Sequence, residues 1–315
     1  MICIYHSRDL DGYSSAAIIK LKYPEAKLIG FDYGQTLPMH QIPAGEEVIM
    51  VDVSLPMAEM KHLAVHAGKL TWIDHHKSAI DDFHAYFCKE TPRKEVELSY
   101  GGGGLVIAYP LTYLGIRHSV HAQLQIGIAA CEIAWQWCFG DTEMPMAIKL
   151  LGEYDTWRNS DNDRWENGIL PFQFGLRQIC NSPETFPQEL FLLYPKVVDD
   201  IIKQGITILQ YQAQVNAAQC KGAFEYEFEG YKAICLNAGG INSEAFKTVY
   251  DESKHDIMMP FKYDGKTGNW VISLYSTKPE IDCSAIAKTR GGGGHKGAAG
   301  FQVKDINTVF TNLNN

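Results

Sequence analysis

The sequence lacks several features that would assign it to a familiar class. None of its eight cysteines belongs to a C-x-x-C pair, which fits reduced thiols in a reducing compartment. No apolar run reaches about 18 residues, and the N-terminus has neither a basic start nor a sustained apolar stretch, so neither a membrane span nor a secretion signal is predicted. Low-complexity tracts are absent as well. We therefore expect a globular, cytoplasmic protein that does not associate with membranes.

Positive charge is also scarce. The chain has 28 Lys and Arg residues against 37 Asp and Glu residues, which gives a net charge of −9. Proteins that hold long duplex nucleic acid neutralise its phosphates with Lys and Arg, so this composition argues against such a partner. A small phosphorylated ligand stays compatible with it, because bound metal ions can supply positive charge locally.

The length predicts more than one domain. A chain of 315 residues exceeds the roughly 100 to 200 residues of a typical domain. We expect residues 1–190 to form an α/β domain with a parallel sheet covered by helices on both faces. Residues 191–222 are interpreted as a helical linker, and residues 223–315 as a smaller α/β domain with a mixed sheet.

The pattern of apolar residues supports this division. In the first half, short β-type runs alternate with helical segments, as in βαβ units; the predicted strands are Ile2–Tyr5, Lys27–Phe31, Val48–Val53 and Leu70–Ile73. Apolar residues at helical spacing then predict helices over Gly104–Leu114, His121–Cys138 and Met146–Tyr154, followed by a loop over 156–185. Beyond a helical stretch over 187–220, hairpins are predicted at 224–236 and 257–275, with helices at Ser243–Tyr250 and Cys283–Lys288.

Acids and imidazoles follow three of the predicted parallel strands. His6, Asp9 and Asp11 follow the first, Asp52 ends the third, and Asp74-His75-His76 follow the fourth. The carboxyl ends of parallel strands share one edge of the sheet, and carboxylates gathered there repel one another unless cations or protons neutralise them. The pattern therefore predicts divalent metal ions, and the number of ligands suits two better than one. Mixed carboxylate and imidazole ligands favour Mn²⁺, with Zn²⁺, Fe²⁺ or Co²⁺ as substitutes and Mg²⁺ less favoured.

A glycine run near the C-terminus is a second candidate site. Gly291 to Gly294 are preceded by Arg290 and followed by His295. Glycines let backbone N–H groups approach an anion closely, and the flanking residues add positive charge. A flexible turn is the alternative interpretation.

These motifs together resemble those of the DHH phosphoesterases. His6-x-x-Asp9-x-Asp11 is similar to the first motif of that family, Val51-Asp52 to the second, Asp74-His75-His76 to the third, and Asp155 within residues 153–157 to the fourth. The segment from Arg290 to Gly300 resembles the signature of the C-terminal domain associated with it. Trp157, close to the fourth motif, is interpreted as a packing residue rather than as part of a cleft.

The resemblance implies an activity and a role for each residue. The activity is hydrolysis of short oligonucleotides or small nucleotide phosphates by a hydroxide that two metal ions activate. His6, Asp9 and Asp52 would hold one ion, and Asp11, Asp52, His75 and Asp155 the other. Asp74 would orient an imidazole, and His76 would contact the phosphate or protonate the leaving oxygen. The substrate would be bound by Gly292, Gly293, Gly294, His295 and Arg290.

Two departures from the family pattern leave alternatives open. His6 lies three positions before Asp9, where several relatives have four, and Tyr275 stands close to a position where many relatives carry arginine. A catalytically silent nucleotide-binding regulator is one alternative, although all the expected acids are present. A hydrolase of pyrophosphate or polyphosphate is another. The sequence also leaves open the choice between RNA and DNA, and whether the chain forms a homodimer.

Overall fold

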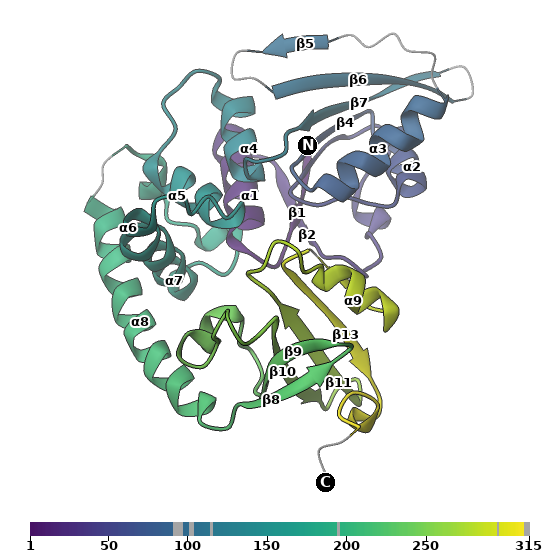
Figure 1. The fold of residues 1–315 in the computed structure, drawn as a ribbon. Helices are drawn as coiled ribbons and strands as arrows, with labels where there is room; N and C mark the ends of the chain where they lie inside the picture. The colour runs from purple at the N-terminus through teal and green to yellow at the C-terminus, as the bar shows by residue number, and fades with distance from the viewer. Residues whose placement is uncertain (91–96, 101–103, 114–115, 194–195, 295, 312–315) are drawn as a thin grey trace. The chain divides into compact units, whose positions relative to one another are not determined.

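The computed structural model describes residues 1–315 except 91–96, 101–103, 114–115, 194–195, 295 and 312–315 (Figure 1). The chain divides into two compact units, Met1–Leu209 and Gln210–Asn315. Each unit has its own sheet and its own hydrophobic core, so each is described by itself.

The first unit is built on a seven-stranded sheet of order β2-β1-β3-β4-β7-β6-β5. Its strands are β1 (Ile2–His6), β2 (Lys27–Phe31), β3 (Glu47–Val51), β4 (Lys69–Asp74), β5 (Glu97–Tyr100), β6 (Gly104–Tyr113) and β7 (Ile116–Leu124). Strands β2, β1, β3, β4 and β7 are parallel, while β6 and β5 continue the sheet in antiparallel pairing. The predicted parallel sheet is confirmed, and a hairpin extends it.

Helices cover both faces of this sheet, as the sequence predicts. Successive strand residues point to opposite faces; Cys3 and Tyr5 of β1 pack in one core, whereas Ile2 and Ile4 pack in another. The first core is completed by α1 (Leu10–Lys22), α4 (Ala130–Phe139), α5 (Met146–Asp155), α7 (Leu170–Ile179) and the start of α8 (Lys196–Cys220). The second is completed by α2 (Met57–His66) and α3 (Lys77–Glu90).

Part of the predicted helical content is wrong. Residues 104–113 and 116–124 form strands β6 and β7, which pair from Leu105↔Leu124 to Tyr113↔Ile116. Short apolar runs fit both the helical and the strand period, and here the ladder to β4 decides the outcome. The predicted loop over 156–185 contains α6 (Asn162–Arg164) and α7, and a 3₁₀ turn at Gln188–Phe191 precedes α8.

The second unit contains a six-stranded mixed sheet of order β12-β13-β11-β10-β9-β8. Its strands are β8 (Phe224–Phe228), β9 (Tyr231–Asn237), β10 (Ile257–Asp264), β11 (Asn269–Tyr275), β12 (Gly293–Gly294) and β13 (Ala298–Val303). Both predicted hairpins are present, and β9 pairs with β10 in parallel. Helix α9 (Cys283–Thr289) is confirmed, whereas the predicted helix at Ser243–Tyr250 is a 3₁₀ helix over Ser243–Thr248.

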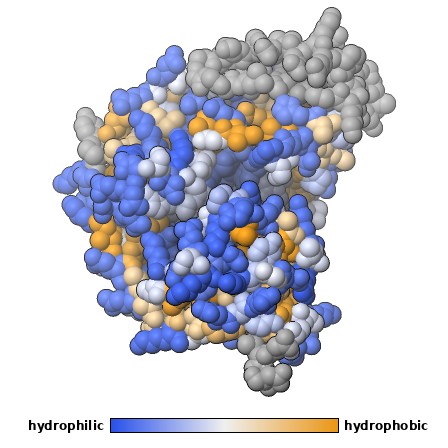
Figure 2. Space-filling view, viewed as in Figure 1, coloured by the Kyte–Doolittle hydropathy of each residue, from blue (hydrophilic) through white to orange (hydrophobic). Residues whose placement is uncertain are grey.

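The surface and the cysteines agree with the composition. Hydrophilic surface predominates on the face in Figure 2, where hydrophobic residues are scattered in small groups. Within the described part of the chain, no helix is both long enough and apolar enough to cross a bilayer. Seven cysteines, among them Cys131 and Cys138, are buried free thiols.

Candidate metal centre

The ends of β3 and β4 place two acids inside the protein. Asp52 follows β3 and is 1% exposed, and Asp74 ends β4 with no exposed surface. The backbone of Asp52 has φ +58°, a left-handed conformation that costs a residue with a side chain roughly 1 to 3 kcal/mol. Strained residues of this kind cluster at functional sites, so this backbone conformation supports a functional role for Asp52.

The loop after β1 carries the first motif into helix α1. Asp9 is the N-cap of α1, and its Oδ1 accepts a hydrogen bond of 2.9 Å from the Gly12 amide. A Cβ on Gly12 would lie 2.0 Å from the carbonyl oxygen of His6, so only glycine lets the helix start this close to the strand. Asp9 and His6 are thereby held together, with Asp9 Oδ2 2.9 Å from His6 Nδ1.

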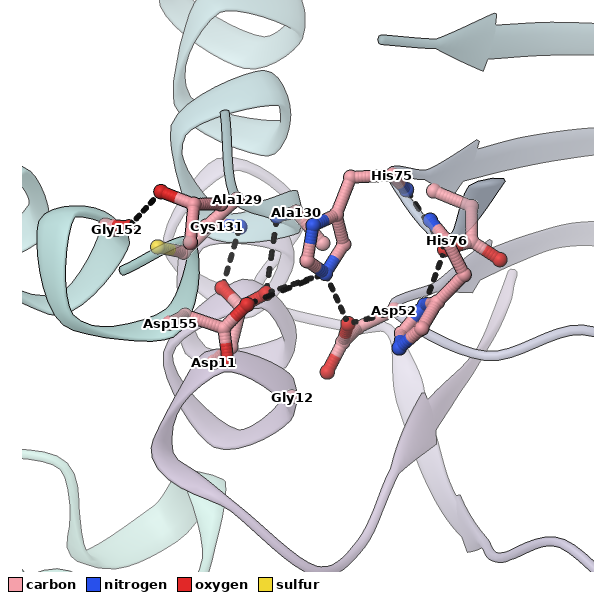
Figure 3. Close-up of polar contacts among 12 residues, drawn as sticks. Asp11, Gly12, Asp52, His75, His76, Ala129, Ala130, Cys131, Gly152 and Asp155 are labelled. Carbon is pink, nitrogen blue, oxygen red and sulfur yellow. Dashed lines mark hydrogen bonds and ion pairs between the residues drawn. The ribbon is translucent and has the colours of Figure 1, made fainter. Parts of the chain in front are cut away.

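Asp11 lies in the first turn of α1 but is bound by another helix. Its two carboxylate oxygens accept hydrogen bonds of 2.9 and 2.8 Å from the backbone amides of Ala130 and Cys131, the first residues of α4 (Figure 3). The positive end of a helix dipole stabilises a negative charge placed there. Helix α4 thus fixes the position of a buried carboxylate that is 4% exposed.

His75 brings the acids of three segments together. Its Nε2 lies 3.3 Å from Asp52 Oδ1, 3.3 Å from Asp155 Oδ2 and 3.6 Å from Asp11 Oδ2. Asp155 is the last residue of α5, and Figure 3 shows the His75 ring between it, Asp11 and Asp52. Three acids that are far apart in the sequence, Asp11, Asp52 and Asp155, therefore all lie close to His75 Nε2.

Asp74 organises the two histidines that follow it. Its Oδ1 accepts hydrogen bonds from the backbone amides of His75 and His76, at 2.7 and 3.1 Å, and contacts His76 Nδ1 at 2.7 Å. A buried carboxylate with three donors to one oxygen fixes both the loop and the His76 ring. This geometry agrees with an orienting role for Asp74.

The same side chains form three overlapping groups with the spacing of metal ligands. These groups are His6-Asp9-Asp52, Asp11-His75-Asp155 and Asp52-Asp74-His75-His76, each with ligand atoms within 4.8 Å of one another. One buried atom supports an ion rather than hydrogen bonding: Asp74 Oδ2 has no hydrogen-bond partner in the described residues. Because buried polar atoms are normally satisfied, and because imidazole and carboxylate ligands suit Mn²⁺ and related ions, the residues present fit a metal centre.

The protonation equilibria show how unfavourable this cluster is without cations. Burial, together with the neighbouring charge of Asp52, raises the pKa of Asp11 to about 7, and burial with the charge of Asp11 raises the pKa of Asp155 to about 7. Burial opposes the charged form of His75, but contacts with Asp52 and the other acids outweigh it and raise its pKa to about 10. The same balance, with Asp52 and Asp9, raises the pKa of His6 to about 10. The cluster therefore binds protons strongly when no cation is present.

Two acids beside the site were missed in the sequence. Asp32 follows β2, with Oδ1 3.5 Å from His6 Nε2, and pairs with Arg8. It carries the signal that identified Asp52, an acid at a strand end. Glu132 is 6% exposed; its Oε2 accepts from the Ala129 amide at 3.0 Å and from Arg158. Only the fold reveals that pairing, which ties the start of α4 to the segment after Asp155.

Trp157 corrects another expectation. The side chain is 57% exposed rather than packed in the interior, and its backbone has φ +52°. Trp135 of α4, by contrast, is buried at 5% exposure.

In the second unit, the glycine run is part of the sheet. Gly293 and Gly294 pair with Gly300 and Ala299 of β13. A Cβ on Gly292 would lie 2.1 Å from the Gly300 carbonyl oxygen, so close packing of the backbone requires glycine there. Gly293 and Gly294 therefore form a short strand rather than a flexible turn.

The other predicted residues of the second unit have varied settings. Arg290 binds Glu229 and the Thr308 carbonyl, and its guanidinium lies over the Phe228 ring, 5.6 Å from the centroid. These contacts account for its position without a ligand. Tyr275 lies in β11, and burial raises its pKa. His295 lies outside the described residues.

Comparisons with known proteins agree at the level of the fold. No family model matches the chain, and no curated protein sequence does. A pGpG-specific phosphodiesterase from Vibrio cholerae superposes with a TM-score of 0.52 and 12% identity, covering 98% of this chain and 94% of that one. An exopolyphosphatase-related protein from Bacteroides fragilis matches with a TM-score of 0.46 and 13% identity, covering 96% and 86%. The first match shows a shared two-domain α/β fold and confirms the predicted fold class; the second score is too low to argue from.

Proposed function

We propose that this chain is a DHH-type phosphoesterase that depends on divalent metal ions and hydrolyses short oligonucleotides or small nucleotide phosphates. One observation carries the proposal: Asp52 belongs to two overlapping ligand groups, with Oδ2 3.5 Å from His6 Nδ1 and Oδ1 3.3 Å from His75 Nε2. A buried carboxylate shared in this way suits two adjacent ions. The motif order and the fold shared with a solved phosphodiesterase support the same assignment.

The ligand sets are those that the family resemblance implies, and the groups His6-Asp9-Asp52 and Asp11-His75-Asp155 support them. His6, Asp9 and Asp52 would hold one ion, and Asp11, Asp52, His75 and Asp155 the other; we favour Mn²⁺. When bound, two such ions supply an activated water and neutralise charge that develops on the phosphoryl oxygens. Asp9, Asp11, Asp52 and Asp155 match the charge of two divalent cations.

The protein's own proton donor is His76. Its Nδ1 contacts Asp74 Oδ1 at 2.7 Å, which leaves Nε2 as the atom available to a substrate. Burial disfavours the charged ring, but the hydrogen bond and charge of Asp74 outweigh this and raise the pKa of His76. A protonated Nε2 can donate to the leaving oxygen, which is the role that we assign to it.

The second unit would supply contacts to the substrate phosphate. By resemblance we assign these to Gly292, Gly293, Gly294, His295 and Arg290. We keep the division into a catalytic domain at 1–190, a linker at 191–222 and a substrate-binding domain at 223–315 as part of the proposal.

A comparison of substrates tests this function. Purified protein with Mn²⁺ is incubated with dinucleotides, longer oligonucleotides, 3′-phosphoadenosine 5′-phosphate and pyrophosphate, and the initial rates are compared. We expect the highest kcat/KM on the short nucleotides. Preference for pyrophosphate would favour the polyphosphatase-like alternative, and metal binding without turnover of any substrate would favour a silent nucleotide-binding protein.

A further inference from the structure

An aromatic cluster lies directly beyond the metal-ligand candidate Asp155. The rings of Tyr154 and Trp165 stack with centroids 5.7 Å apart and planes inclined by 4°. Trp157 stacks on Trp165 at 5.2 Å and 23°. Arg177 lies over the Tyr154 ring, 5.5 Å from its centroid. Tyr154 immediately precedes Asp155 and Trp157 follows it by two residues, so the cluster is anchored to the site.

The members of the cluster differ sharply in exposure. Trp165 is 5% exposed, whereas Trp157 is 57% exposed. Trp72 and Trp135, which pack in the core of the same unit, are 0% and 5% exposed. Packing alone therefore does not account for Trp157. Its indole is supported by a buried ring, yet it keeps more than half of its surface available.

The backbone around Trp157 is held in an unusual conformation. Trp157 has φ +52°, which is an outlier for a bulky residue. Its amide donates to the Tyr154 carbonyl at 3.2 Å, and the next residue, Arg158, is held by Glu132 and by Thr156 Oγ1. The segment is thus rigid, and a rigid aromatic surface loses little freedom when a ligand stacks on it.

We propose that Trp157 is a stacking platform for a nucleobase of the substrate, and thereby a determinant of specificity for nucleotides over base-free phosphates. The Cα atoms of Asp155 and Trp157 are at most about 7 Å apart, since two peptide units join them; this lies within the span of one nucleotide from phosphate to base. Stacking tolerates any base, because each has a π face. The inference rests on the proposed function, since it assumes that the phosphate is bound at the metal centre.

Binding measurements test the platform independently of turnover. Full-length protein with Mn²⁺ is titrated with AMP and with ribose 5-phosphate by calorimetry. The variant is Trp157→Asn, because asparagine tolerates the left-handed backbone and has no ring; Trp157→Phe keeps an aromatic face. Tyr211→Ala is the control, since Tyr211 is 70% exposed but lies in α8, outside the proposed catalytic and substrate-binding domains.

We expect the wild type to bind AMP more tightly than ribose 5-phosphate. Trp157→Asn should weaken AMP binding by roughly 5- to 100-fold and leave ribose 5-phosphate unchanged, while Trp157→Phe and Tyr211→Ala stay close to wild type. With a dinucleotide substrate, the loss should appear in KM more than in kcat. Equal binding of AMP and ribose 5-phosphate by the wild type, or wild-type AMP binding by Trp157→Asn, would overturn the inference.

These outcomes are separable from a failure of the proposed function. If the wild type hydrolyses nothing but the preference for AMP still depends on Trp157, the platform stands and the enzymatic assignment falls. If dinucleotides are hydrolysed equally well by the wild type and Trp157→Asn, the assignment stands and the platform falls.

Discussion

Replacing Asp52 by asparagine is the sharpest perturbation of the site. The substitution keeps the shape of the side chain and tolerates φ +58°, but it removes a charge that lies 3.3 Å from His75 Nε2 and 3.5 Å from His6 Nδ1. At an effective dielectric of about 20, opposite unit charges about 3.5 Å apart attract by ~5 kcal/mol. If the transition state loses ~4 kcal/mol of this attraction, kcat/KM should fall about 10³-fold.

The metal content and the stability of Asp52→Asn should change in opposite directions. Burial, with the charges of Asp9 and Asp155, raises the pKa of Asp52, so the ionised carboxylate is unfavourable without cations. We therefore expect the metal-free variant to melt at or above the wild-type temperature, and the gain in melting temperature on adding Mn²⁺ to shrink. Elemental analysis should show the loss of at least one ion per chain.

A neighbouring acid provides the matched control. Asp32 also follows a parallel strand, and its Oδ1 lies 3.5 Å from His6 Nε2, but it belongs to none of the three ligand groups. Asp32→Asn should keep both ions and most of the activity. Full metal stoichiometry and wild-type rates in Asp52→Asn would refute the shared-ligand reasoning.

Three further outcomes are expected. The pKa values of Asp11, Asp155 and His6 are raised in the folded protein, so the folded state holds more protons than the unfolded chain. The melting temperature of metal-free protein, measured with a chelator, should therefore fall as the pH rises from about 5 to 8.5. Added Mn²⁺ should offset that fall. A melting temperature that rises over this pH range would contradict the prediction. Gly12→Ala places a Cβ 2.0 Å from the His6 carbonyl oxygen; urea unfolding should show a loss of about 3 kcal/mol or more, with reduced metal content, and wild-type values would disprove the close approach. Glu132→Ala leaves the buried Ala129 amide without its acceptor and removes one acceptor of the partly exposed Arg158. We expect it to cost about 2 kcal/mol in the same assay; a neutral result would show that water replaces the carboxylate.

The strands that carry the site could be predicted because their apolar runs are too short for a helix and contain β-branched residues. Val48 to Val51 and Leu70 to Ile73 are short apolar runs that end at an acid, and parallel pairing brings such ends to one edge. Asp155 was different: it ends a helix, and no periodicity marks it as a ligand, so it was identified through the family resemblance alone.

The errors arise where tertiary contacts decide. Residues 104–113 have apolar residues that fit a helix, but pairing with β7 makes them a strand. The pairing of Glu132 with Arg158 has no local sign in the sequence, since the two residues are 26 positions apart. Trp157 was assigned to packing because tryptophan is usually buried in large part, and nothing in the sequence reports a left-handed backbone at a non-glycine residue.

The hydrogen bond between Asp74 and His76 commits one imidazole to a single tautomer. A carboxylate oxygen can only accept, so the hydrogen must reside on Nδ1, and the neutral ring must carry its lone pair on Nε2. His76 can therefore gain or lose a proton only at Nε2. If His76 donates its Nε2 proton to the leaving oxygen, as proposed, the ring would have to be reprotonated at that same atom before the next turnover.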